Sequence, residues 1–340
     1  MNSAPLSVIV PNYNHGEHLP RCLQALLNQS LQPAEIIVID DASTDNSLEV
    51  IDHFARKHSV IRPYRNERNR GVIYGVNRGI ELARQEYVYF APADDETLPG
   101  LFEDSFQLLR LHPQAGLCCS ISDFREIETG FNWHVGVGMS DRPCYLDPRR
   151  MVDLERHGKL HIAPNTSVIK CSALIEAGSF IPELKWHSDW FGFYVVGFRY
   201  GICFVPKPLA VFYVHATSYY TTGRRNKSEH RLVLQRILDL LLRSEYQDVA
   251  ALLRESGALY LFAWPMLKLI LGNRAYRQFL TPVLLRKNFW HSVKLELKKI
   301  TPRFAAEWYF RLAGYRAPKT GARPSNPPQP RRDTNQHGQG

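Results

Sequence analysis

The sequence lacks the cysteine spacings that build metal-binding or redox modules. Its six cysteines are scattered, and no CxxC pair occurs among them. Several lie in apolar runs, where a buried thiol acts as a small hydrophobe. We therefore expect reduced cysteines and a cytosolic protein. Zinc-finger and RNA-recognition spacings are also missing, so nucleic acid is not an expected partner.

Long apolar runs are missing as well. The N-terminus has no basic segment followed by an apolar stretch, and it leads directly into the strand-like run LSVIV. We therefore expect no signal peptide. The most apolar later stretch, residues 258–271, is interrupted by Pro265 and Lys268 and is too short for a transmembrane span.

Glycine-rich phosphate motifs do not follow the first apolar run, where residues 11–14 read PNYN. A dehydrogenase would carry GxGxxG at that point. A sugar nucleotidyltransferase would carry a glycine-rich, basic loop. The dehydrogenase is therefore not expected, and the nucleotidyltransferase is kept as a minor alternative.

Positive charge, by contrast, is in excess. The 340 residues carry a net charge of +9, and 44% of them are hydrophobic. This composition is typical of a globular protein with one large domain and an accessory region, or with two domains. The excess charge suits a polyanionic partner, such as a phosphorylated substrate or an anionic membrane surface.

The first part of the chain alternates short β-branched runs with amphipathic helical segments. This alternation predicts an α/β fold with a Rossmann-like, mostly parallel sheet and helices on both faces. Ligand-binding loops should gather at the carboxyl ends of the strands. Polar residues follow four of the runs, at 12–14, 40–41, 69 and 94–95.

Two adjacent carboxylates, Asp94 and Asp95, follow the apolar run Tyr87–Phe90. One of them could cap the helix expected near Leu98, as aspartate often does. Adjacent carboxylates also repel each other unless a cation lies nearby. Mg²⁺ or Mn²⁺, bound by one or two carboxylates and by substrate phosphates, would relieve the repulsion and stabilise a departing diphosphate. The local pattern leaves both interpretations open.

Four motifs stand in a distinctive order. They are SVIVPNYN at 7–14, EIIVIDDASTD at 35–45, NRG with NRGI at 69–80, and YVYFAPADDETLP at 87–99. Together they resemble glycosyltransferase family 2, whose members have the GT-A fold, over residues 5–110, and a weaker match continues through 165–215. The resemblance implies an inverting transferase that moves a sugar from a nucleotide-diphosphate donor to an acceptor hydroxyl.

The resemblance also implies roles for individual residues on the donor side. Pro11 and Tyr13 would line the nucleoside pocket, and Asp41 would contact the base of a uridine-diphosphate donor. Asn69 and Arg78 would lie in the segment that closes on the nucleotide.

The same resemblance makes Asp94 the metal-binding residue of a DxD motif, with Asp95 in support and His215 near the metal and the diphosphate. Pro92 stands where many family members have an aspartate. Asp94 would therefore hold the metal largely alone, without the usual ribose contact.

On the acceptor side, a single displacement needs a carboxylate that takes the proton of the attacking hydroxyl. Asp189 is the candidate by resemblance, although Ser188 replaces a usual first acid, and a helix cap is the alternative. Trp186 and Trp190 would stack on acceptor sugars or belong to the core. Asn165 would line the acceptor pocket.

We expect a GT-A domain over residues 1–220, with a donor half at 1–115 and an acceptor half at 116–220. Residues 225–316 would be a helical extension rich in basic and aromatic side chains, lying in an anionic membrane interface or packing as a helical cap. Residues 317–340 should be disordered.

These expectations combine into one function. An inverting glycosyltransferase would use Mn²⁺ or Mg²⁺ to move a sugar from a UDP-sugar to a glycan or lipid-linked acceptor, in cell-surface polysaccharide biosynthesis at the inner face of the plasma membrane. The alternative is a catalytically degenerate domain that binds a sugar nucleotide or a partner enzyme, which Pro92 and Ser188 keep open.

Overall fold

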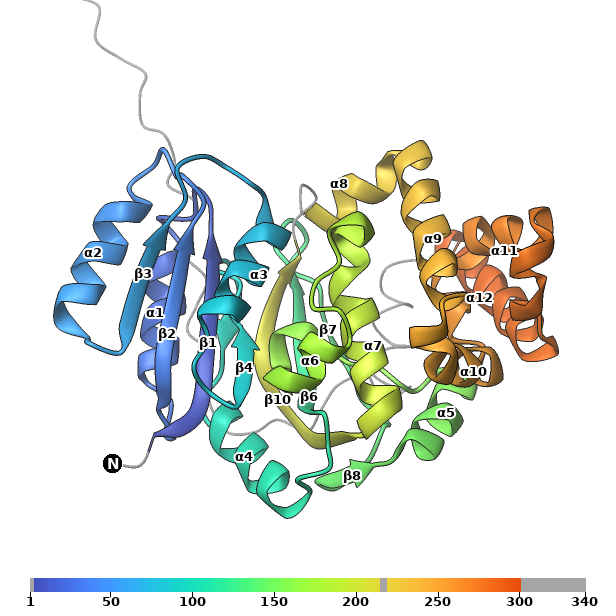
Figure 1. Cartoon of the computed structure of the whole chain (residues 1–340), viewed down its shortest axis with the longest axis horizontal. Coiled ribbons are helices and arrows are strands. Elements are labelled where there is room, and N and C mark those ends of the chain that lie inside the picture. The colour runs from blue at the N-terminus through green and yellow to red at the C-terminus, as the bar shows by residue number, and fades with distance from the viewer. Residues whose placement is uncertain (1–2, 215–218, 301–340) are drawn as a thin grey trace, which may run out of the picture.

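A computed structural model describes residues 3–214 and 219–300, with the backbone alone for 219–221 and 295–300. His215 and the predicted disordered tail, residues 317–340, lie outside the described residues. A single sheet occupies the centre of the molecule, and helices pack around it (Figure 1).

The ten strands of the described chain form this sheet in the order β3-β2-β1-β4-β9-β6-β10-β5, with β7 on β6 and β8 on β10. Their bounds are β1 (Ala4–Asn12), β2 (Pro33–Asp40), β3 (Ile61–Arg65), β4 (Tyr87–Phe90), β5 (Glu96–Thr97), β6 (Leu117–Glu126), β7 (Asn132–Val135), β8 (Cys144–Leu146), β9 (Val168–Lys170) and β10 (Ile202–Val214). Strands β1 to β4 are mutually parallel, as are β6 and β10, whereas β5, β7, β8 and β9 pair antiparallel. The predicted mostly parallel sheet is confirmed, and the carboxyl ends of β1 to β4 meet at one edge.

Helices cover both faces of the sheet, because alternate residues of a strand point to opposite sides. On β1, Val8 and Val10 join a core with α1 and α4, while Ile9 joins a core with α3 and α7. The helices of the first 214 residues are α1 (Leu19–Leu27), α2 (Ser47–Lys57), α3 (Val72–Leu82), α4 (Leu101–Leu111), α5 (Pro148–Arg156), α6 (Cys171–Glu176) and α7 (Ser188–Tyr200), with 3₁₀ turns η1 (Pro164–Thr166) and η2 (Pro182–His187).

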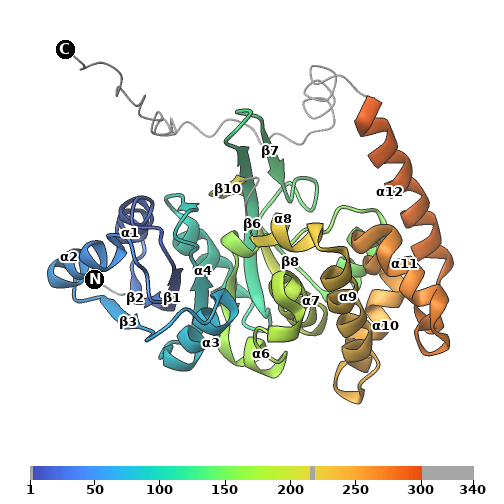
Figure 2. The same cartoon turned by 90° about the horizontal axis from the view of Figure 1, so that it is seen from above.

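A helical extension follows the sheet and lies at the end of the molecule opposite α2 and β3 (Figures 1 and 2). It consists of α8 (Tyr219–Arg225), α9 (Lys227–Leu241), η3 (Ser244–Tyr246), α10 (Gln247–Ser256), η4 (Ala258–Phe262), α11 (Ala263–Gly272), η5 (Arg274–Phe279) and α12 (Pro282–Ile300). The extension shares its apolar core with α5 and α7. The domain boundaries expected from the sequence stay a prediction.

A buried ion pair ties the extension to the sheet domain. Lys287 Nζ on α12 lies 2.8 Å from Glu155 Oε1 on α5, and the Tyr194 hydroxyl donates to Glu155 Oε2. Burial raises the pKa of Glu155 and lowers the pKa of Lys287, and the pairing opposes both shifts. Among the described residues, no helix combines the length and apolar character needed to cross a bilayer.

One local expectation was wrong. The helix expected near Leu98 begins only at Leu101, because Glu96–Thr97 pairs with β10 and Gly100, at φ 90°, reverses the chain before the helix. Strand β10 runs without a break over Ile202–Val214. Its pairing with β6 is irregular between Val205 and Ala210, where two prolines cannot donate to the ladder.

Candidate functional site

The loops after β1 and β2 are joined at the carboxyl edge of the sheet. Asn12 Nδ2 donates to Asp40 Oδ1 at 2.9 Å and to Ser43 Oγ at 3.2 Å. Asp40 is buried and also accepts the Ser43 N–H, so its carboxylate is used within the fold. Beside this junction, Pro11 lies at the end of β1 and the ring of Tyr13 is 42% exposed.

Asp41 closes the loop of residues 66–71 onto the end of β2. Its carboxylate accepts hydrogen bonds from Asn66 Nδ2 at 2.8 Å, from Arg70 N at 3.0 Å and from Gly71 N at 2.7 Å. Both oxygens of this buried side chain are therefore engaged. Asp41 thus positions the segment in which the nucleotide contacts are expected.

The other two donor-side candidates lie in and after that loop. Asn69 is exposed, and its Oδ1 accepts the Gly71 N–H at 3.0 Å. Arg78 is exposed on α3, where its guanidinium pairs with Glu81 at 2.8 Å. Their roles in nucleotide binding stay predictions, as do those of the residues on β1.

Asp94 follows β4 and differs from the other carboxylates of this edge. Whereas Asp40, Asp41 and Asp45 accept hydrogen bonds from neighbouring loops, no described protein group hydrogen-bonds to the Asp94 carboxylate. Its main-chain carbonyl accepts a 2.8 Å hydrogen bond from Arg21 Nη2 on α1. The backbone of Asp94 is therefore held in place while its side chain is available to a ligand.

Asp95, in contrast, is a buried anchor. Its Oδ1 accepts the Tyr213 N–H of β10 at 3.3 Å, and its Oδ2 reaches no partner within 3.5 Å among the described residues. The nearby Asn165 amide nitrogen is also buried without a partner at that distance, yet lies close enough to lower the pKa of Asp95. Burial, and next the charge of Asp94, raise that pKa well above its usual range.

A divalent cation fits these residues. It would be held through the available Asp94 carboxylate, and its charge would offset the negative charge that two adjacent aspartates and a diphosphate bring together. In the described part of the chain, no cluster of three or more histidine, cysteine or acidic side chains could hold a metal by itself. Mg²⁺ and Mn²⁺ need no such cluster when substrate phosphates complete their coordination.

Asp189 lies in the first turn of α7, where its Oδ1 accepts the Trp190 N–H at 2.6 Å. Burial raises the pKa of Asp189 to about 6, and the hydrogen bonds from its own turn oppose the shift. A carboxyl with such a pKa is suited to taking up a proton near neutral pH. The preceding Ser188 is buried, and its hydroxyl donates to the Ile181 carbonyl at 3.0 Å.

The two tryptophans and Asn165 do not form an open acceptor platform. Trp186 is 7% exposed, and its ring lies so close to Gly223 that a Cβ there would come within 2.2 Å of it. Trp190 packs edge-on against Phe262 of the extension, with ring centroids 4.7 Å apart. For Trp186 the expectation of sugar stacking is corrected to the alternative of core packing, because Gly223 of α8 lies against its ring. Trp190 is half-buried, and its stacking role stays a prediction. Asn165 is buried beside Asp95.

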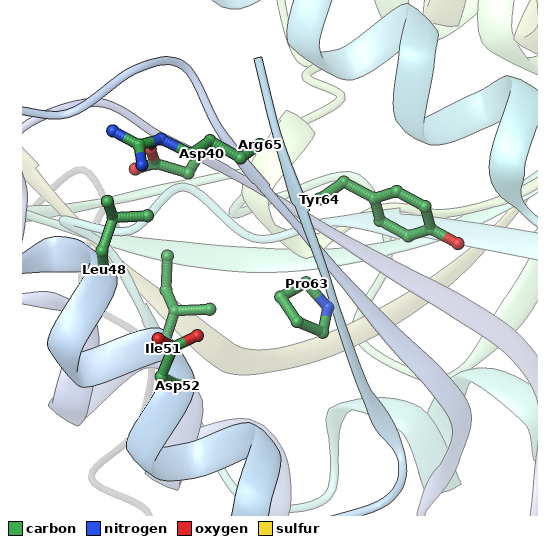
Figure 3. A pocket seen from close by; sticks show the side chains of 7 residues that line it. All are labelled: Asp40, Leu48, Ile51, Asp52, Pro63, Tyr64 and Arg65. Atoms are coloured by element: carbon green, nitrogen blue, oxygen red, sulfur yellow. Dashed lines mark ion pairs between the residues drawn. The ribbon is translucent and has the colours of Figure 1, made fainter. Parts of the chain in front are cut away.

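A small cavity of about 220 Å³ lies elsewhere, on the side of α2 and β3 (Figure 3). It is lined by Asp40, Leu48, Ile51, Asp52, Pro63, Tyr64 and Arg65. It shares Asp40 with the loop junction described above, but none of the residues predicted to bind the donor, the metal or the acceptor lines it.

The sequence did not reveal the roles of two residues that lie beside the candidate site. Arg21 orients Asp94, and its guanidinium lies 4.5 Å from the ring centroid of Tyr213. Asn77 on α3 exchanges two hydrogen bonds with the main chain of Phe180, which joins α3 to the segment leading to Asp189. The NRGI motif drew attention to the segment around Asn77. No motif marked Arg21, which lies in an ordinary amphipathic helix.

Comparisons with known proteins bear on the family and on the fold. The family model described as "Glycosyl transferase family 2" matches residues 7–177. The "Uncharacterized glycosyltransferase YibD" of Escherichia coli K12 is 29% identical over 73% of this chain and 74% of its own. The "Putative glycosyltransferase EpsH" of Bacillus subtilis is 23% identical over 76% of this chain and 72% of its own.

Solved structures show the same fold. S. aureus TarS 1–349 in complex with UDP-GlcNAc superposes with a TM-score of 0.57 at 16% identity, covering 81% of this chain and 79% of that one. The mannosyltransferase PcManGT of Pyrobaculum calidifontis, in complex with GDP-Man and Mn²⁺, gives 0.51 at 16% identity, covering 86% and 87%. The fold is therefore GT-A, and the chain belongs to glycosyl transferase family 2.

Proposed function

We propose that this protein is an inverting glycosyltransferase. It moves a sugar from a nucleoside-diphosphate sugar, a UDP-sugar, to a hydroxyl of a glycan or lipid-linked acceptor in cell-surface polysaccharide biosynthesis. The observation that carries the proposal is the Asp94 carboxylate. Among the aspartates compared at the carboxyl edge of the sheet, it alone has no hydrogen-bond partner in the described protein.

The proposed chemistry gives one role to each of two carboxylates, Asp94 and Asp189. The acceptor oxygen attacks the anomeric carbon, the bond from that carbon to the diphosphate oxygen breaks, and Asp189 takes the hydroxyl proton. Attack opposite the leaving group inverts the anomeric centre. Mn²⁺ or Mg²⁺ held by Asp94 would supply Lewis-acid stabilisation of the departing diphosphate. His215 is proposed to lie near the metal and the diphosphate.

The donor and acceptor are proposed from different observations. The TarS complexes contain UDP-GlcNAc and UDP, which supports a uridine donor here, with Pro11, Tyr13 and Asp41 around the base. The basic and aromatic extension supports an acceptor presented at an anionic membrane surface, on its cytoplasmic face. Transfer would then occur where a lipid-linked glycan exposes its hydroxyl.

The test is nucleotide release and sugar transfer by the full chain with a panel of nucleotide sugars and Mn²⁺. Asp94→Ala and Asp94→Asn, and EDTA on the unchanged protein, are expected to abolish turnover. Asp52→Ala, an exposed aspartate on α2, is the matched control and should leave it unchanged. Normal turnover in both Asp94 variants would contradict the proposal. Mn²⁺-dependent donor binding without turnover for any donor would favour the degenerate domain instead.

A further inference from the structure

Residues 256–295, which include α11 and most of α12, carry charge of one sign only. Between Glu255 and Glu296 the sequence contains no aspartate or glutamate. Its basic residues in that interval are Lys268, Arg274, Arg277, Arg286, Lys287 and Lys294. Of these six residues, Lys287 is buried in an ion pair. The other five are exposed, and no acidic residue lies among them in the sequence.

Large apolar side chains share the outer surface of α11 with that charge. Trp264 is 53% exposed and Leu271 is 45% exposed, and they stand seven residues apart on one face of the helix. Lys268 lies between them, with its Nζ 5.8 Å from the Trp264 ring centroid. The opposite face carries Met266 and Ile270, which are fully buried.

Helix α12 repeats this arrangement. Phe289 is 62% exposed and Trp290 is 57% exposed, one turn after Leu285 and Arg286, which are also exposed. Leu284, on the other side of the helix, is buried against the rest of the extension. The exposed aromatic rings therefore contribute little to the apolar core of the protein.

We propose that the outer faces of α11 and α12 are a docking surface for an anionic lipid bilayer. The docking surface consists of Trp264, Lys268, Leu271, Leu285, Arg286, Phe289 and Trp290. This inference rests on the proposed function, and it specifies which surface of the protein would contact the membrane. Its evidence is confined to α11 and α12, which carry none of the candidate donor or base residues.

Charge and side-chain type select this partner. Tryptophan and phenylalanine are favoured at the boundary between headgroups and acyl chains, and lysine and arginine are attracted to anionic headgroups. The seven residues of the docking surface offer both kinds of side chain, and none of them is acidic. Both helices lie at the outer end of the molecule, opposite β3 and α2, where a flat partner could approach them (Figures 1 and 2).

The test is flotation of the full chain with vesicles. Binding is expected to mixed phosphatidylcholine and phosphatidylglycerol, and not to phosphatidylcholine alone. Phe289→Ala with Trp290→Ala should lower the partition coefficient about tenfold or more, because apolar area drives insertion. Lys268→Ala with Arg286→Ala should lower it about fivefold for each charge removed. Leu111→Ala with Ile175→Ala, exposed apolar residues of α4 and α6, is the matched control and should bind as the unchanged protein does.

The following results would contradict the inference. Failure of the unchanged protein to bind anionic vesicles, or unchanged binding by the Phe289/Trp290 variant with a normal melting temperature, excludes this surface as the docking site. A dimer in size-exclusion chromatography that the same variant dissociates would identify a second copy of the chain as the occupant. Nucleotide release in solution should be equal in all these proteins, so its loss through Asp94→Ala would test the proposed function separately.

Discussion

Arg21 and Asp94 are joined by a 2.8 Å hydrogen bond that runs from the guanidinium to the main-chain carbonyl. The same guanidinium lies 4.5 Å from the ring centroid of Tyr213. A residue of α1 therefore fixes the turn after β4 against β10. The side chain proposed to hold the metal is positioned by contacts made through its backbone.

The first prediction concerns that contact. Arg21→Ala should lower the transfer rate by about 10- to 100-fold, because a hydrogen bond from a charged donor is lost and the Asp94 turn loosens. It should also raise the Mn²⁺ concentration needed for half-maximal rate, which a purely structural role would not do. A Mn²⁺ titration of nucleotide release measures both.

Two variants make this measurement specific. Arg21→Lys keeps a cation that can reach the carbonyl and should recover part of the Mn²⁺ response. Arg110→Ala, an exposed arginine of α4, should behave as the unchanged protein does. A Mn²⁺ response in Arg21→Ala identical to that of the unchanged protein would exclude the positioning role.

The second prediction concerns pH. Burial raises the pKa of Asp189 to about 6, and only its deprotonated form can accept the hydroxyl proton. The transfer rate should therefore fall as the pH drops through about 6 and be level above it. Asp189→Asn should reduce transfer about 10²- to 10⁴-fold while leaving donor affinity unchanged. The pH profile of transfer and calorimetric donor titration check these two statements, and a normal rate in Asp189→Asn would refute the base assignment.

The third prediction concerns the ion pair between α5 and α12. Lys287→Met should destabilise the protein by about 3–5 kcal/mol, because the Glu155 carboxylate stays buried without its partner. Combining it with Glu155→Gln removes the stranded charge and should restore much of the loss. Urea unfolding followed by circular dichroism measures both proteins.

A surface ion pair provides the comparison. Arg149 lies 2.9 Å from Glu255, and its side chain is 77% exposed. Arg149→Ala should change the unfolding free energy by about 0–1 kcal/mol. Equal effects from Arg149→Ala and Lys287→Met would show that burial of the Glu155 pair does not matter for stability.

Much of the sheet could be predicted because its strands are encoded locally. The run Tyr87–Phe90 forms β4 with the bounds expected, and the polar strand ends meet at one edge as the alternation of strands and helices required. The antiparallel insertion of β9 between β4 and β6 could not be seen. It depends on pairing Val168 with Tyr89, far apart in the sequence.

The site was harder to predict because its decisive contacts are also distant in the sequence. Asp94 and Asp95 look equivalent in the sequence, and the N–H of Tyr213 makes one of them an anchor. Trp186 could have been open or buried, and it is buried because Gly223, which lies after the last strand in the chain, packs against its ring. The sequence around a tryptophan does not indicate which later helix will pack against its ring.

The hydrogen bonds of Asp41 have a consequence for engineering donor choice. The carboxylate expected to read the nucleobase also orders residues 66–71 through Asn66, Arg70 and Gly71. A substitution there changes loop order and base contact at once, so weaker binding in an Asp41 variant would not by itself measure base recognition. Altered specificity is better sought at Tyr13, whose exposed ring can be replaced while the loop keeps its anchor.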